Sequence, residues 1–153
     1  MGVLSFISAR LMETWAHGQD VCDAVAAERV PTDRLRHIAH LGVRARPFSY
    51  LARGRDVPAG RIDVAVTGPG GDEWRWEIGA ATEAGGDTTG ADDISDTNAV
   101  ATVTGTALDF CLAVTQRRNI ADTDLVVTGA LAADWMTIAQ AFAGPPGPGR
   151  APA

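Results

Sequence analysis

The sequence predicts an α+β protein in which a long N-terminal helix precedes a mostly antiparallel sheet covered by helices. Three observations carry this prediction. Apolar residues recur at three- and four-residue spacing near the N-terminus, two runs of alternating polarity follow in the middle, and the last third twice repeats a strand-like run followed by a helix-like run. A chain of 153 residues is long enough to bury one proper core.

The first part of the chain is expected to be helical. Residues 3–28 have an apolar side made of Leu4, Ile7, Leu11, Trp15, Gly18, Cys22 and Val25. A second helix is expected over residues 35–52, after a cap at Thr32 or Asp33. Because Pro47 lies inside this second helix, it should kink the helix or split it into two pieces.

The middle of the chain changes to a strand pattern. Residues 62–67 and 74–78 alternate with period two, and the segment between them, 68–72, is rich in glycine. Two alternating runs around a glycine-rich turn predict a β-hairpin. Residues 83–98 are acidic and nearly devoid of large apolar groups, which predicts a mobile loop.

The last third is expected to contain two further strands, each followed by a helix. The strands are residues 100–103 and 125–128. The first helix opens at Gly105 or Thr106. The second begins after Gly129, and its apolar side comprises Leu131, Trp135, Ile138, Ala139 and Phe142.

These patterns divide the chain into four parts. Residues 1–30 hold the long helix, residues 31–57 the connecting helix, and residues 58–143 an α/β domain. Residues 144–153 consist mainly of proline, glycine and alanine, which predicts a disordered tail.

Composition and charge narrow the classes of function. A net charge of −6 argues against nucleic acid or an anionic membrane as the main partner. No apolar run approaches the ~20 residues of a membrane span. The first residues of the sequence do not resemble an export signal. We therefore expect a cytoplasmic protein whose two cysteines, Cys22 and Cys111, are reduced thiols. All 13 basic residues are arginine, which suggests a GC-rich genome.

Glu13 and His17 are the most informative pair in the sequence. They lie four residues apart in the first predicted helix, so a carboxylate and an imidazole can reach one point. Both are zinc ligands by type, and a catalytic zinc site usually takes three protein ligands. Asp20 could orient the imidazole. A solvated polar face opposite an apolar stripe is the other reading of the same spacing.

The sequence contains three further sets of side chains that could be reactive. His37 and His40 share a helix face and could bind a metal, or could be partly exposed and capped by carboxylates. Cys22 and Cys111 fall on apolar faces and are expected to be core residues. The adjacent arginines Arg117–Arg118 either complement a helix C-terminus or bind a carboxylate in a cleft.

Three segments resemble, in order, the mycothiol-dependent maleylpyruvate isomerase family, a branch of the DinB-like proteins. Residues 9–21 (ARLMETWAHGQDV) resemble the last helix of its metal-binding four-helix bundle, and residues 31–42 (PTDRLRHIAHLG) resemble the helix that follows. Residues 103–112 (VTGTALDFCL) with Gln116–Arg118 resemble its C-terminal domain, which is similar to sterol-carrier-like α/β modules.

The resemblance implies a metal- and thiol-dependent isomerase or transferase. Glu13 and His17 match two metal ligands, and Arg117 matches a catalytic arginine, with Arg118 as the competing register. The cofactors would be a divalent metal, most simply zinc, and a low-molecular-weight thiol such as mycothiol. The substrate would carry a carboxylate. The family's third ligand is a histidine on an earlier helix that has no match here, so the chain is expected to be a C-terminal portion with an incomplete metal site.

Two other functions are compatible with the same sequence. One is a non-enzymatic module that binds a lipid-like small molecule in its α/β half. In the other, the helix over residues 3–28 exposes an apolar stripe and pairs with a second copy to form a dimer.

Overall fold

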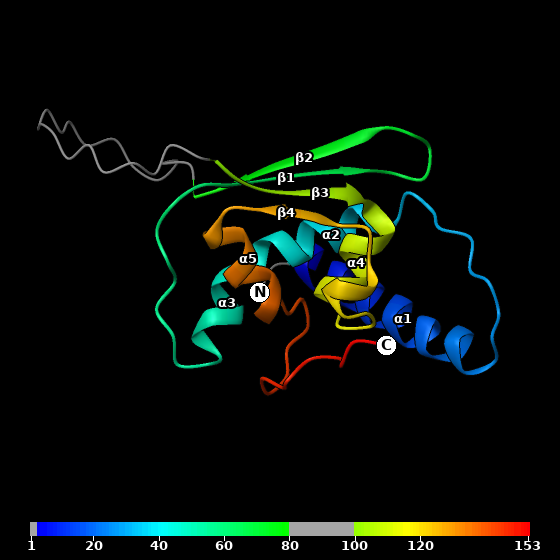
Figure 1. Ribbon diagram of the computed structural model, residues 1–153. Helices are drawn as coiled ribbons and strands as arrows, with labels where there is room; N and C mark the ends of the chain where they lie inside the picture. The colour runs from blue at the N-terminus through cyan, green and yellow to red at the C-terminus, as the bar shows by residue number, and fades with distance from the viewer. Residues whose placement is uncertain (1–2, 80–99) are drawn as a thin grey trace, which may run out of the picture.

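The computed structural model describes residues 3–79 and 100–153, and it has the expected α+β architecture. One sheet forms a layer whose helices gather on a single side (Figure 1). The predicted loop at residues 83–98 lies outside the described residues. Among the described helices, none is both long and apolar enough to cross a membrane.

The sheet has four strands in the order β2-β1-β3-β4. Their bounds are β1 Ile62–Thr67, β2 Glu73–Ile78, β3 Ala101–Thr106 and β4 Val126–Thr128. The predicted hairpin is confirmed, since β1 and β2 pair antiparallel with Val64 opposite Trp76. β3 lies parallel to β1, with Val103 opposite Val64, whereas β3 and β4 are antiparallel. The sheet is therefore mixed, with two antiparallel pairings and one parallel pairing.

Five α-helices surround the core on the covered side. Their bounds are α1 Val3–Ala24, α2 Leu35–Arg44, α3 Arg46–Leu51, α4 Ala107–Val114 and α5 Ala130–Ile138, and a short 3-10 turn, η1, spans Ile120–Asp122. The predicted second helix is split at Ala45, and Pro47 occupies the first turn of α3, where its missing N–H costs nothing. Thr106 caps α4 by accepting a hydrogen bond from the Asp109 N–H.

The last helix is shorter than its apolar pattern predicts. It ends at Ile138, and Ala139 has extended backbone angles. Beyond the helix, the N–H of buried Gln140 donates to Ser49 Oγ, and its side-chain amide donates to the carbonyls of Phe142 and Gly144. These hydrogen bonds with α3 and with the following chain replace helical ones, so Phe142 lies outside α5.

The core lies between the covered face of the sheet and α2, α4 and α5. Its members are fully buried aliphatic and aromatic side chains, including Ile38, Val64, Val103, Phe110 and Trp135. The rings of Phe110 and Trp135 meet edge to face with centroids 6.2 Å apart. Such pairs add to the free energy of burial, so α4 and α5 are fixed against each other.

The buried side of α1 differs from the predicted stripe. Met12, Trp15 and Ala16 are buried against the rest of the fold, whereas Ile7 and Val25 are 57% and 67% exposed. α1 packs mainly on α2 through its central turns, which selects the face centred on Met12 and Ala16. As a result, the polar side of α1 borders its buried side instead of lying opposite to it.

Residues 144–153 form no helix or strand, but they are held against the domain. The Gly147 carbonyl accepts a hydrogen bond from Arg53, and the Ala153 N–H donates to Asp122. Arg150 and the segment around Asn119 exchange hydrogen bonds: the Arg150 carbonyl accepts from Asn119 Nδ2, and its guanidinium donates to the Arg117 carbonyl. The segment predicted to be a disordered tail therefore contacts the loop that follows α4 (Figure 1).

Candidate metal and anion site

Glu13 and His17 lie on successive turns of α1, at the edge of its buried face. The Glu13 carboxylate pairs with Arg10 at 2.7 Å. The His17 side chain is 76% exposed, and its Nδ1 lies 3.4 Å from Asp20 Oδ2, three residues further along. An imidazole held through Nδ1 by a carboxylate presents Nε2 to its surroundings, which is a usual arrangement of metal-binding histidines.

The loop after α4 brings Arg117 to the same region. Thr115 ends the helix, and Gln116 has φ +59°, a left-handed conformation that turns the chain sharply. The Gln116 side chain donates to the Ala139 carbonyl, and Arg117 Nη1 donates to the Thr115 carbonyl at 2.7 Å. Both arginines follow directly after the end of α4, and the hydrogen bond from Arg117 to Thr115 agrees with the interpretation that Arg117 complements the C-terminus of this helix.

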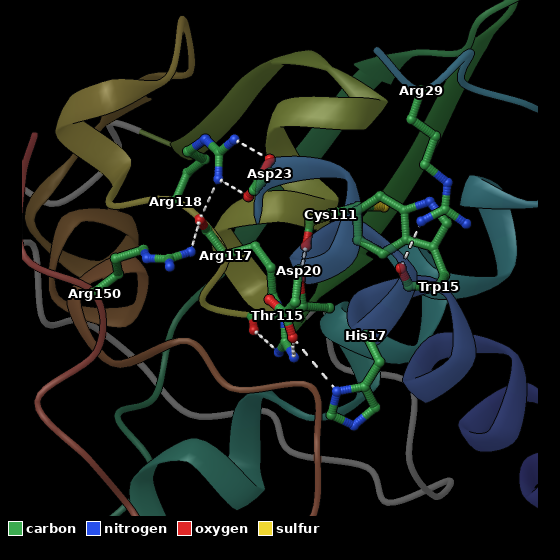
Figure 2. A network of polar contacts seen from close by, with 10 residues as sticks. All are labelled: Trp15, His17, Asp20, Asp23, Arg29, Cys111, Thr115, Arg117, Arg118 and Arg150. Carbon is green, nitrogen blue, oxygen red and sulfur yellow. Dashed lines mark hydrogen bonds and ion pairs between the residues drawn. The ribbon is translucent and has the colours of Figure 1, made fainter. Parts of the chain in front are cut away.

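Two ion pairs fasten this loop to α1 (Figure 2). Arg117 binds Asp20 with two hydrogen bonds, from Nε to Oδ1 at 3.2 Å and from Nη2 to Oδ2 at 2.8 Å. Arg118 also binds Asp23 with two hydrogen bonds, from Nη1 to Oδ2 at 2.6 Å and from Nη2 to Oδ1 at 2.8 Å. The two aspartates are three residues apart on one helix face and the arginines are consecutive, so the pairs lie side by side.

These pairs set the electrostatics of the region. The Arg117 guanidinium, with a smaller contribution from His17, lowers the pKa of Asp20 although partial burial acts in the opposite direction. Arg118, helped by Gln19, lowers the pKa of Asp23 to about 2. Both carboxylates are therefore ionised at neutral pH.

Glu13, His17 and Arg117 all line one pocket of about 250 Å³. Its lining residues are Met12, Glu13, Ala16, His17, Arg117, Phe142 and Ala143. The Arg117 side chain is only 16% exposed, so a guanidinium is presented from the wall of a hollow that also has an apolar floor. A carboxylate, an imidazole and a guanidinium at one pocket can bind a cation and an anion next to each other.

The donor types of Glu13 and His17 fit zinc, but two donors are fewer than a protein zinc site uses. Within residues 3–79 and 100–153 there is no group of three or more His, Cys, Asp or Glu side chains that could hold a metal ion. A third protein ligand would have to come from outside the described residues.

The remaining candidates lie elsewhere. His40 is tied to the sheet, since its Nδ1 accepts a hydrogen bond from Trp76 Nε1 at 3.2 Å, and burial lowers its pKa. His37 is exposed on the same helix. Cys111 is fully buried as expected, which raises the pKa of its thiol, and its Sγ donates to the Leu35 carbonyl. Cys22 is half-buried.

A larger groove of about 440 Å³ lies on the other side of the α1–loop junction, between α4 and the segment that follows α1. Leu108, Leu112 and Val30 give it an apolar lining. Its two arginines are already engaged: Arg118 pairs with Asp23, and Arg29 stacks over the Trp15 ring at 5.3 Å and donates to the Trp15 carbonyl. The smaller pocket differs from this groove in that its lining includes a carboxylate, an imidazole and a guanidinium, from Glu13, His17 and Arg117.

Sequence reasoning found Glu13, His17 and Arg117 but missed what joins them. The Asp23–Arg118 pair and the pocket wall at Phe142 were not anticipated. A usable signal was present, because two aspartates spaced i, i+3 on a helix can face two consecutive arginines elsewhere. The sequence does not say that the two segments meet.

Fold and pocket together define an α+β protein with a carboxylate–imidazole pair beside an arginine. Two uncharacterized proteins of Mycobacterium tuberculosis, from strains CDC 1551 / Oshkosh and ATCC 25618 / H37Rv, are each 45% identical to the chain over 150 residues. The match covers 98% of this chain and 51% of each relative, so the chain spans about half the length of the curated relatives it matches. No family model and no solved structure matches it.

Proposed function

We propose that the chain carries part of a metal site and the neighbouring anion site of a metal- and thiol-dependent isomerase or transferase, as in the mycothiol-dependent maleylpyruvate isomerase family. The observation that carries the proposal is the pocket shared by Glu13, His17 and Arg117. Arg117 lies about a hundred residues further along the chain than the other two, so their convergence was not implied by sequence proximity.

Each residue has a separate role in this proposal. Glu13 and His17 supply an oxygen and a nitrogen ligand to a divalent cation, for which Glu13 must release Arg10. Arg117 holds a carboxylate of the substrate from the pocket wall. A bound zinc ion would keep a low-molecular-weight thiol as the thiolate near neutral pH. Met12, Ala16 and Phe142 supply an apolar part of the pocket lining, against which the hydrocarbon part of a substrate would pack.

The outer face of α1 supports a third ligand from another segment. Phe6, Ile7 and Val21 are all more than half exposed on this helix, close to exposed His17. Apolar side chains that remain exposed on one helix face are typical of an interface. We propose that another protein segment, or a second copy of this chain, packs there and completes the metal site.

A zinc titration tests the metal-binding part of this function. The purified chain is titrated with Zn²⁺ by calorimetry, and Glu13→Gln and His17→Gln are compared with it. We expect saturable binding in the wild type and at least about a tenfold loss of affinity in each variant, because each removes one ligand.

Glu28→Gln and His37→Gln are matched controls, since they make the same chemical changes at exposed positions away from the pocket. Their zinc affinity should equal that of the wild type. Equal affinity in all five proteins, or no saturable binding in the wild type, would refute the assignment. Sedimentation with and without zinc then shows whether a second copy completes the site.

The larger groove supports a second candidate function, the binding of a lipid-like small molecule without catalysis. Its apolar lining between α4 and the segment after α1, at about 440 Å³, has the size of a small-molecule site. A panel of fatty acyl and sterol ligands should then raise the melting temperature in the absence of metal. No shift with any of them would exclude this candidate.

A further inference from the structure

One oxygen of Asp20 is shared between the two halves of the pocket. Oδ2 accepts a hydrogen bond from Arg117 Nη2 at 2.8 Å, and the same atom lies 3.4 Å from His17 Nδ1 (Figure 2). The carboxylate is 43% exposed, so it has room to move between the two partners.

Asp20 occupies the edge of Arg117 that a substrate would need. A guanidinium binds carboxylates best through two parallel N–H groups, and here Nε and Nη2 both donate to Asp20. Nη1 is directed to the Thr115 carbonyl. A small carboxylate can therefore take the preferred position on Arg117 only by replacing Asp20.

Arg117 is accessible from two hollows. It lines the pocket that contains Glu13 and His17, and it lines a second hollow of about 330 Å³ shared with Asp20, Gln116 and Arg150. An anion entering from either side meets the same guanidinium, so replacing Asp20 requires no change in the fold.

We propose that Asp20 is an internal competitor for the anion site at Arg117: a small carboxylate displaces it, and the released Asp20 keeps His17 as its partner. This inference rests on the proposed function for its substrate, because it concerns the same pocket. Competition by Asp20 excludes anions that bind Arg117 weakly. It also couples the arrival of a carboxylate at Arg117 to the orientation of the His17 imidazole.

The neighbouring Asp23–Arg118 pair has a different role. Asp23 Oδ1 also accepts a hydrogen bond from Gln19, and no histidine contacts its carboxylate among the described residues. Arg118 does not line the pocket that contains His17. This pair acts only as a fastener between α1 and the loop, so it provides a matched control for a change at Asp20.

The test is a succinate titration of the metal-free chain at constant ionic strength, measured by calorimetry for every variant. Where Arg117 is present, the NMR signal of its Nε–H group shows that succinate binds at this side chain. Asp20→Asn keeps the shape of the side chain but removes its charge. We expect it to bind succinate about tenfold more tightly than the wild type, the equivalent of 1.4 kcal/mol. Asp23→Asn should match the wild type, and Arg117→Gln should abolish binding.

Three results would overturn the inference: equal or weaker succinate binding in Asp20→Asn, an equal gain in Asp23→Asn, or persistent binding in Arg117→Gln. Circular dichroism shows whether each variant is folded. If Asp20→Asn is not folded, the titration is repeated with Asp20→Ala. No metal is present, so failure of the zinc titration above leaves this result intact, and the reverse holds as well.

Discussion

The core beneath the sheet and the junction between α1 and the loop after α4 are held together by different forces. In the core, fully buried side chains such as Val64, Phe110 and Trp135 pack against one another. At the junction, two aspartates of α1 meet Arg117 and Arg118, and the side chains of these pairs remain partly exposed.

This difference shows why the candidate pocket lies at the junction. Burial of apolar surface is worth about 25 cal/mol per Å² and favours tight packing without gaps. Partly exposed ion pairs contribute little to stability and keep water, space and charge available. Substitutions at three places in the protein test this difference between the core and the junction.

The largest loss of stability should follow from a cavity in the core. Phe110 is fully buried against Trp135, so Phe110→Ala should lower the free energy of unfolding by about 3–5 kcal/mol. Urea denaturation measures the loss. Phe48→Ala makes the same change at a side chain that is 40% exposed and should cost far less. Equal losses would show that Phe110 is not in the core.

An intermediate effect is expected where α2 crosses α4. A Cβ at Gly42 would lie 2.7 Å from Val114 Cγ2, closer than carbon atoms pack. Gly42→Ala should therefore destabilise the protein by about 1–3 kcal/mol, although the same change in an open helix would be stabilising. Thermal unfolding shows whether Gly42→Ala lowers or raises the melting temperature. Gly70→Ala, whose Cβ would have Asp72 Oδ2 as its nearest neighbour at 4.0 Å, should be nearly neutral.

The smallest effect concerns the junction and depends on pH. The pKa values of Asp20 and Asp23 are lowered by Arg117 and Arg118, so the folded state binds protons more weakly than the unfolded state. The pairs therefore stabilise the protein above about pH 4, and this contribution is lost as the pH falls towards about 2.

Variants with Asp20→Asn and Asp23→Asn together should lose at most about 2 kcal/mol at neutral pH, because both pairs are partly exposed. Urea denaturation at neutral pH and at about pH 2.5 should show this difference shrinking in acid. Asp56→Asn, at an exposed carboxylate without an ion pair among the described residues, should leave the pH profile unchanged. A constant difference at both pH values would contradict the assignment.

Much of the fold could be read from local patterns. Alternation predicted β1 and β2, Pro47 predicted the break between α2 and α3, and Thr106 predicted the start of α4, whereas Gly105 lies in β3. The parallel pairing of β3 with β1 was not predicted, because strand order depends on contacts between distant segments. The exposure of Ile7 and Val25 was missed for the same reason: the buried apolar side chains of α1 lie in its central turns, and Val25 lies beyond the end of the helix.

By itself, the sequence determined the α+β class, most of the elements, and three reactive side chains, Glu13, His17 and Arg117. These follow from periodicity, turn residues and residue type, all of which act over a few positions of the chain. Only the tertiary structure decided that the three side chains line one pocket and that Asp20 and Asp23 bind Arg117 and Arg118. The physical reason is that an ion pair between residues so far apart leaves no periodic trace in the sequence and forms only when packing of α1 brings its partners together.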